Sequence, residues 1–377
     1  MTKHDYKQNA YYLMYLIRCV LNNKTPAKEK LDKMDLSGVF EVAKGHSLTA
    51  IAAYALESAG IYDKDFEEEK NKAIRKTIIL DAERENVLAE LEKACIWYMP
   101  LKGILIKDLY PQIGMRQMCD NDILFDKTKI KYLKQVMLSL GFKMVHDDFG
   151  HDIVFTKPPL SNFEMHTHLF GSGQDEKMNQ YYDNVKVKLI NNDNYGFHFS
   201  NEDYYIFMIA HANKHFSRGG TGLRSLVDTY VYLNHYAGKL DMRYIENECE
   251  KLGIAEYEKQ TRNLSLHLLG GKKLTAGECK MFDYIIFSGT YGTIDNIVSN
   301  TIKKNSNGHF DKIKYICQRL MVPVSEKNEK YRIFAIYYPW FYKSKARLPL
   351  LFFYRIGSIF TSKRSRAKAE ISALRKI

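Results

Sequence analysis

Three short runs between residues 98 and 166 decide how this chain is interpreted. They are YMPLKG at 98–103, CDNDILF at 119–125 and FEMH at 163–166. The first run predicts a short strand that ends in a glycine turn, and the other two predict strands that carry acidic side chains. The stretch therefore predicts strands that bring carboxylates and a glycine turn into one site.

Asp120 and Asp122 are two residues apart in a run that continues with apolar residues. Residues i and i+2 of a strand lie on the same face, so the sequence predicts that both carboxylates enter one cleft. Two carboxylates this close repel each other, and a divalent cation removes that cost. Glu164 alternates with apolar neighbours and is the candidate for a third carboxylate. Mg²⁺ prefers such oxygen ligands, and two ions about 3.5–4 Å apart can clamp an in-line displacement.

Lys102 and Gly103 supply a candidate phosphate turn. Glycine tolerates backbone conformations that let a phosphate approach the main chain. Apolar residues within 104–110 have helical spacing, so we expect a helix start that directs N–H groups at a triphosphate. Lys102 adds a point charge, and Arg116 adds a planar fork for a phosphate oxygen.

Together these motifs resemble the uncharacterised bacterial nucleotidyltransferases of the DNA polymerase beta superfamily. The shared pattern is Leu-Lys-Gly, Tyr-Pro, Arg, Asp-x-Asp and Glu-x-His, found here at 101–103, 110–111, 116, 120–122 and 164–166. The resemblance is strong over about 95–170. It implies an α+β fold with a small mixed β-sheet core that uses an NTP and Mg²⁺. By position, Asp120, Asp122 and Glu164 become metal ligands. Well-understood superfamily members carry Gly-Ser or Gly-Gly where this chain has Lys102-Gly103.

Further polar residues follow the third run. His166 lies two residues after Glu164. We favour a role as hydrogen-bond partner of a carboxylate over the alternative role of a base. His211 and His215 are four residues apart on a predicted helix, but no third metal ligand is evident. In the resembling family a His, an Arg and an Asp recur here, which implies that His211, Arg224 and Asp228 form a substrate-facing wall.

The whole chain of 377 residues divides into four regions by composition and pattern. We expect an N-terminal helical region at 1–95, the catalytic core at 96–199, a C-terminal helical region at 200–325 and a basic, aromatic-rich helical tail at 326–377. Six cysteines are scattered without paired spacing, and the first residues lack a signal-peptide pattern. These features predict a cytoplasmic protein with reduced thiols.

The tail carries most of the net charge. Between 341 and 377 there are ten basic residues and one acidic residue, so this segment contributes +9 of the formal +12. The basic residues flank aromatic and apolar runs. This composition predicts an anionic surface of the inner membrane or an acidic partner. Nucleic acid is a less favoured partner, and a solvated terminal helix is the alternative.

The sequence thus predicts a nucleotidyltransferase that moves NMP from an NTP, with ATP favoured, to an unidentified acceptor hydroxyl or phosphate. Two Mg²⁺ ions are expected, and Glu164 serves as ligand, as base or as both. Three alternatives stay open. They are a kinase on the same fold, a non-catalytic nucleotide-binding module, and an adaptor that works through its basic tail.

Overall fold

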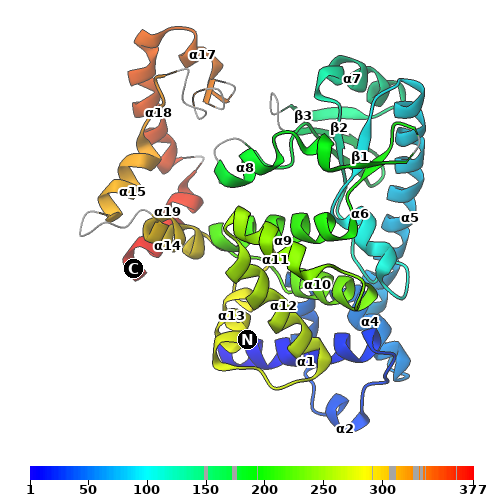
Figure 1. The fold of residues 1–377 in the computed structure, drawn as a ribbon. Coiled ribbons are helices and arrows are strands. Elements are labelled where there is room, and N and C mark those ends of the chain that lie inside the picture. Colours follow the sequence, from blue (N-terminus) through cyan, green and yellow to red (C-terminus); the bar gives the residue numbers. More distant parts are fainter. Residues whose placement is uncertain are drawn as a thin grey trace.

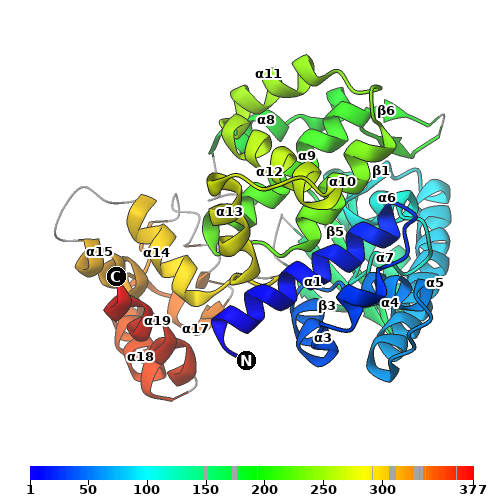
Figure 2. The ribbon, with the colours of Figure 1, turned by 90° about the horizontal axis from the view of Figure 1, so that it is seen from below.

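The computed structural model describes residues 1–147, 152–171, 176–192, 194–290, 292–304, 311–325, 331, 334–335, 337–361 and 363–377. Its elements form three regions: a β-sheet with its covering helices, a larger helical region beneath it, and a separate helical tail (Figures 1 and 2). The fold is α+β, as predicted from the sequence.

The sheet has five strands in the order β1-β2-β5-β4-β3. Only β2 and β5 pair in parallel, and the other neighbours are antiparallel, so the sheet is mixed. The strands are β1 Tyr98–Pro100, β2 Asn121–Phe125, β3 Lys143–Asp147, β4 Asp152–Lys157 and β5 Ser161–His166. A second sheet contains only β6 Ile190–Asn191 and β7 Phe197–His198.

One face of the sheet is covered by α5 Lys64–Lys93 and α7 Ile130–Ser139. Because side chains alternate along a strand, Ile123 and Phe125 of β2 enter this core while Asp122 faces the other way. The same alternation buries Phe163 and Met165 of β5 against the helices. The acidic residues of both strands are therefore left on the opposite face.

That opposite face looks toward helices that precede the sheet in the chain and helices that follow it, and these helices share one hydrophobic core. In Figure 1 the blue N-terminal helices lie against the yellow-green helices that follow the sheet. These helices are α1 Lys3–Leu21, α2 Lys28–Leu31, α3 Leu36–Gly45, α4 Thr49–Ser58, α9 Asn201–Arg218, α10 Arg224–His235, α11 Met242–Leu252, α12 Ala255–Gly270 and α13 Ala276–Ile286. Shorter connecting elements are α6 Gly103–Ile106, η1 Lys107–Leu109, η2 Lys127–Lys129, α8 Glu176–Tyr182 and η3 Val185–Lys188.

The helices from α14 onward stand beside this body, on the left in Figure 1. They include the predicted tail at 326–377 and are together called the tail below. They begin with α14, which packs on α9 and on the last helix, α19. Their bounds are α14 Ile294–Lys304, α15 Asp311–Leu320, α17 Pro339–Tyr342, η4 Lys345–Arg347, α18 Leu348–Phe360 and α19 Arg364–Lys376. Within the described residues, no helix combines the length and apolar character needed to cross a bilayer.

Candidate active site

Asp122 and Glu164 are neighbours across the one parallel strand pair. The register of β2 and β5 places Asp122 directly opposite Glu164. Both side chains leave the sheet on the face away from α5 and α7, so the strand pairing itself brings two carboxylates together. The two residues are 42 positions apart in the chain, and the sequence-based prediction of one acidic site required them to lie close together.

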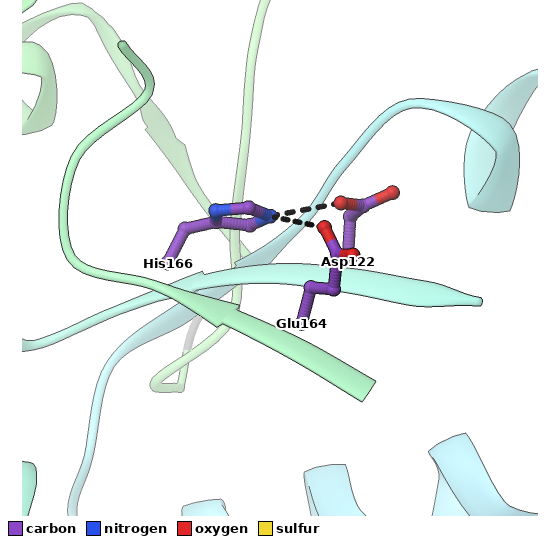
Figure 3. Close-up of side chains that lie close together, drawn as sticks. All are labelled: Asp122, Glu164 and His166. Carbon is purple, nitrogen blue, oxygen red and sulfur yellow. Dashed lines mark hydrogen bonds and ion pairs between the residues drawn. The ribbon is translucent and has the colours of Figure 1, made fainter. Parts of the chain in front are cut away.

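His166 completes a compact group with these carboxylates (Figure 3). Its Nε2 lies 2.8 Å from Asp122 Oδ1 and 3.8 Å from Glu164 Oε2. One ligand atom from each of the three residues lies within 4.8 Å of the others. Among the described residues, no other group of three or more such side chains meets this criterion.

Asp120 occupies a different place from the other two carboxylates. β2 begins at Asn121, so Asp120 precedes the strand, and the expected strand position of both aspartates holds only for Asp122. Asp120 lines the adjacent cavity and does not belong to the compact group. It is still close enough for the charge of Asp122 to raise its pKa, an effect second to burial.

The surroundings shift the pKa values of Glu164 and Asp122 in opposite directions. Burial, followed by the charges of Asp122 and Asp120, raises the pKa of Glu164 to about 7. Asp122 is buried as well, but Lys102 and His166 hold its pKa well below the usual range. Asp122 is thus fully ionised, while Glu164 has too little positive charge around it to be fully ionised at neutral pH. A cation would supply that charge.

Lys102 is the positive partner already present. Its Nζ lies 2.6 Å from Asp122 Oδ1, the same oxygen that His166 contacts. The backbone of Lys102 is left-handed, with φ at 50°, which is uncommon for a residue with a Cβ. Tyr204 on α9 donates a hydrogen bond to the Lys102 carbonyl. The left-handed residue in this turn is therefore Lys102 and not Gly103.

Gly103 lies directly against the side chain of Arg116. A Cβ at this position would lie 2.2 Å from Arg116 Nη1, so glycine is needed for close packing. The following helix is also shorter than predicted, because α6 has only four residues before the 3₁₀ turn η1. A single α-helical turn aligns few peptide dipoles, so the dipole contributes less to phosphate binding than one helix over 104–110 would.

Arg116 is held by Asp228 of α10. Arg116 Nε and Nη2 lie 2.9 and 3.0 Å from the two Asp228 oxygens, which is a bidentate ion pair. Tyr110 also donates a hydrogen bond of 2.7 Å to Asp228 Oδ1. Although burial opposes its charge, Asp228 raises the pKa of Arg116 above its usual range. This pair ties the approach to β2 onto the helical region.

A cavity of about 230 Å³ adjoins the acidic group. Lys102, Asp120 and Asp122 line it from the sheet side, and Arg224 and Asp228 line it from α10. His211 and His215 face it from α9, with their Nε2 atoms 3.4 Å apart. Burial lowers the pKa of both histidines, and Lys102 and Lys214 lower it further. Both are therefore neutral at pH 7.

Comparisons with known proteins identify the family of this chain. A family model described as "Uncharacterised nucleotidyltransferase" matches residues 32–270. The chain belongs to this nucleotidyltransferase family. Among solved structures, it is similar to an antigenic nucleotidyltransferase-like protein from Paracoccidioides brasiliensis, with 17% identity and a TM-score of 0.31. That alignment covers 53% of this chain and 94% of the other. A search of curated proteins finds no match.

The family match includes the whole sheet and every candidate site residue of this nucleotidyltransferase, and it ends before α14. It also includes two cationic residues that the sequence analysis did not select, Lys214 and Arg218 of α9. Burial and then the charges of Lys102 and Arg218 lower the pKa of Lys214 to about 8. Neither residue forms an ion pair with a carboxylate of the described residues. The spacing of 211, 214, 215 and 218 on one helix face was the available signal.

Proposed function

We propose that this nucleotidyltransferase transfers NMP from an NTP, with ATP as the first candidate, to an acceptor hydroxyl or phosphate. The observation that carries the proposal is the direct pairing of Asp122 with Glu164 beside a cavity lined by Lys102 and Arg224. A pair of carboxylates suits divalent cations, and Arg224, which has no carboxylate partner among the described residues, suits the phosphates of a nucleotide.

The donor set fits Mg²⁺. Asp122 and Glu164 provide oxygen ligands in one group, and Asp120 provides another from the edge of the cavity. His166 offers nitrogen, which Mg²⁺ accepts less readily, so its bond to Asp122 Oδ1 serves to orient that carboxylate. When bound, Mg²⁺ would neutralise charge that develops on the α-phosphate and on the leaving group.

The transfer reaction requires an in-line displacement at the α-phosphorus and a base for the acceptor proton. The acceptor oxygen forms a bond to the α-phosphorus, the bond from that phosphorus to the β-bridging oxygen breaks, and pyrophosphate leaves with the electron pair. The acceptor proton passes to a base. Glu164 can accept it if the carboxylate is not fully engaged as a ligand, because its pKa of about 7 lies near neutrality.

We assign phosphate binding to basic side chains that have no carboxylate partner among the described residues. Arg224 Nη1 contacts the Gln117 carbonyl at 3.2 Å and forms no ion pair with the described residues. Lys214 is close enough to Lys102 for the charge of Lys102 to lower its pKa, after the larger effect of burial. A bound triphosphate would relieve that repulsion. Arg116 is already committed to Asp228, so we place it outside the direct phosphate contacts.

Replacing Lys214 with methionine is expected to raise the KM for the NTP by about tenfold, because one charged hydrogen bond to phosphate is lost. The thermal midpoint should change little or rise, since the substitution removes a partly buried and repelled charge. Steady-state kinetics with varied NTP provide the measurement. Lys259→Met on the exposed surface of α12 is the matched control. An unchanged KM in Lys214→Met would remove Lys214 from the phosphate site.

Metal affinity is expected to depend on pH through Glu164. Below a pKa of about 7 the Glu164 carboxyl holds a proton, and a cation must displace it. Binding of Mn²⁺, used as a probe for Mg²⁺, should therefore be about tenfold weaker at pH 6 than at pH 8. Isothermal titration at several pH values checks this. The Glu164→Gln variant should lose most of the dependence, and equal affinity at pH 6 and pH 8 in the wild type would contradict the assignment.

The reaction class is tested with NTPs labelled at either the α- or the γ-phosphate. The chain is incubated with each NTP, Mg²⁺ and a cell extract, and the labelled product is analysed by mass. Nucleotidyl transfer places α-label and a nucleoside monophosphate mass on the acceptor. Transfer of γ-label would show a kinase instead, and NTP binding without transfer of either label would favour the binding-module alternative.

A further inference from the structure

Helix α18 has two different long faces. One face is packed: Leu348, Leu351 and Ser358 are buried. On the same face Arg355 donates hydrogen bonds to the backbone carbonyls that end α15. These residues recur at helical spacing, so they hold α18 in a fixed rotation against the tail.

The other face is apolar and open. Leu350, Phe353, Tyr354 and Phe360 have 52, 67, 55 and 73% of their surface exposed. They lie at i, i+3, i+4 and i+10, and Gly357 fills the i+7 position of the same stripe. Trp340 of α17 is also 53% exposed. Contiguous exposed aromatic residues of this kind mark an interaction surface rather than an ordinary solvent face.

Basic residues stand at both ends of this helix. Exposed Lys343 and Lys345 precede it, and exposed Lys363 and Arg364 follow it. The guanidinium of Arg347 lies 4.6 Å from the centroid of the Trp340 ring and so supports that exposed aromatic residue. The only acidic residue after 341 is Glu370, which is already paired with Arg319 and Arg366.

From these observations we infer that the exposed face of α18 docks on the surface of an anionic phospholipid bilayer. The 13 residues of α18 span about 20 Å, less than the ~30 Å hydrocarbon layer, so the helix lies along the interface. Its aromatic side chains enter the headgroup boundary while the flanking cations meet lipid phosphates. A second copy of the chain is a poorer occupant, because two segments of charge +9 would repel each other.

Helix α14 links the tail to the rest of the protein, because it packs on both α19 and α9. Because α9 also lines the active-site cavity, docking of α18 would hold that site near the lipid surface. The inference goes beyond nucleotidyl transfer and does not depend on it.

The test is sedimentation of the full chain with vesicles of phosphatidylcholine alone or with about one third phosphatidylglycerol. We expect binding to the anionic vesicles that weakens with added salt, and little binding to the neutral ones. Phe353→Glu with Phe360→Glu should weaken anionic binding at least tenfold. Tyr62→Glu with Val187→Glu, at positions 71 and 76% exposed elsewhere, is the matched control and should bind as wild type.

The charge contribution is tested separately. Lys343→Glu with Lys345→Glu should also weaken binding at least tenfold, whereas Lys28→Glu with Lys33→Glu, on the exposed surface of the N-terminal region, should have a smaller effect. All four residues are exposed, so these variants are expected to fold. The inference is overturned if the wild type does not bind anionic vesicles, or if the variant with Phe353→Glu and Phe360→Glu binds them as wild type does. It is also overturned if the tail binds RNA instead, or if it forms a dimer that the Phe353→Glu and Phe360→Glu substitutions dissociate.

Discussion

Replacing Asp228 with alanine is expected to destabilise the protein by about 3–5 kcal/mol, because it leaves a buried guanidinium without its carboxylate. Arg116 and Asp228 are only 10 and 11% exposed, and both Asp228 oxygens are used in their ion pair. Tyr110 would also lose its acceptor. Chemical denaturation monitored by circular dichroism provides the free energy of unfolding.

A double substitution separates the ion pair from other effects of Asp228→Ala. Arg116→Met combined with Asp228→Asn removes both charges, so it should recover a large part of the lost stability. Asp183→Ala, at an exposed position, should stay within about 0.5 kcal/mol of wild type. If Asp228→Ala changed the free energy of unfolding as little as Asp183→Ala does, the Arg116–Asp228 ion pair would not stabilise the contact between the sheet region and α10.

Replacing Glu164 with glutamine is expected to stabilise the metal-free protein while removing its function. The raised pKa of Glu164 means that the folded state favours the protonated form, so stability falls as pH rises from 4.5 through about 7. Glutamine removes this cost and should add about 1–2 kcal/mol at pH 8, allowing for the 30% exposure of the side chain. Near pH 4 the two proteins should be equally stable.

The same variant should lose about 10³-fold in transfer activity, since one carboxylate of the cation site is gone. Thermal unfolding with added Mg²⁺ links the two effects. Wild type should be stabilised by the ion through mass action, and Glu164→Gln should not. A variant that is destabilised at pH 8, or that keeps its response to Mg²⁺, would show that Glu164 does not belong to an under-neutralised acidic site.

The carboxylates could be recognised from sequence because strand alternation is a local rule. It placed Asp122 and Glu164 on a polar face, and the family resemblance correctly indicated a small mixed sheet. Their pairing depends on the β2–β5 register, which no local pattern specifies. Asp120 shows the limit of the same rule, because the strand begins one residue later than the Asp-x-Asp spacing suggested.

Interactions between distant segments were not accessible from the sequence. The sequence predicted Arg116 as a phosphate ligand, but it could not predict the ion pair of Arg116 with Asp228, 112 residues away. The left-handed backbone of Lys102 and the contact of Gly103 with Arg116 also depend on tertiary packing. In the tail, composition indicated an anionic partner, but only the packing of Leu351 and Arg355 shows which face of α18 is open.

The most direct test of the central claim compares α-label transfer by wild type and Asp122→Asn in the presence of Mg²⁺ and extract. Asp122 contacts both Lys102 and His166, so asparagine keeps the shape of the site and removes the charge that holds it together. Asp32→Asn on the protein surface serves as the control, and circular dichroism confirms that each variant is folded. We predict transfer by wild type and by Asp32→Asn, with none above background for folded Asp122→Asn. Equal transfer by all three proteins would contradict nucleotidyl transfer at the Asp122–Glu164 pair.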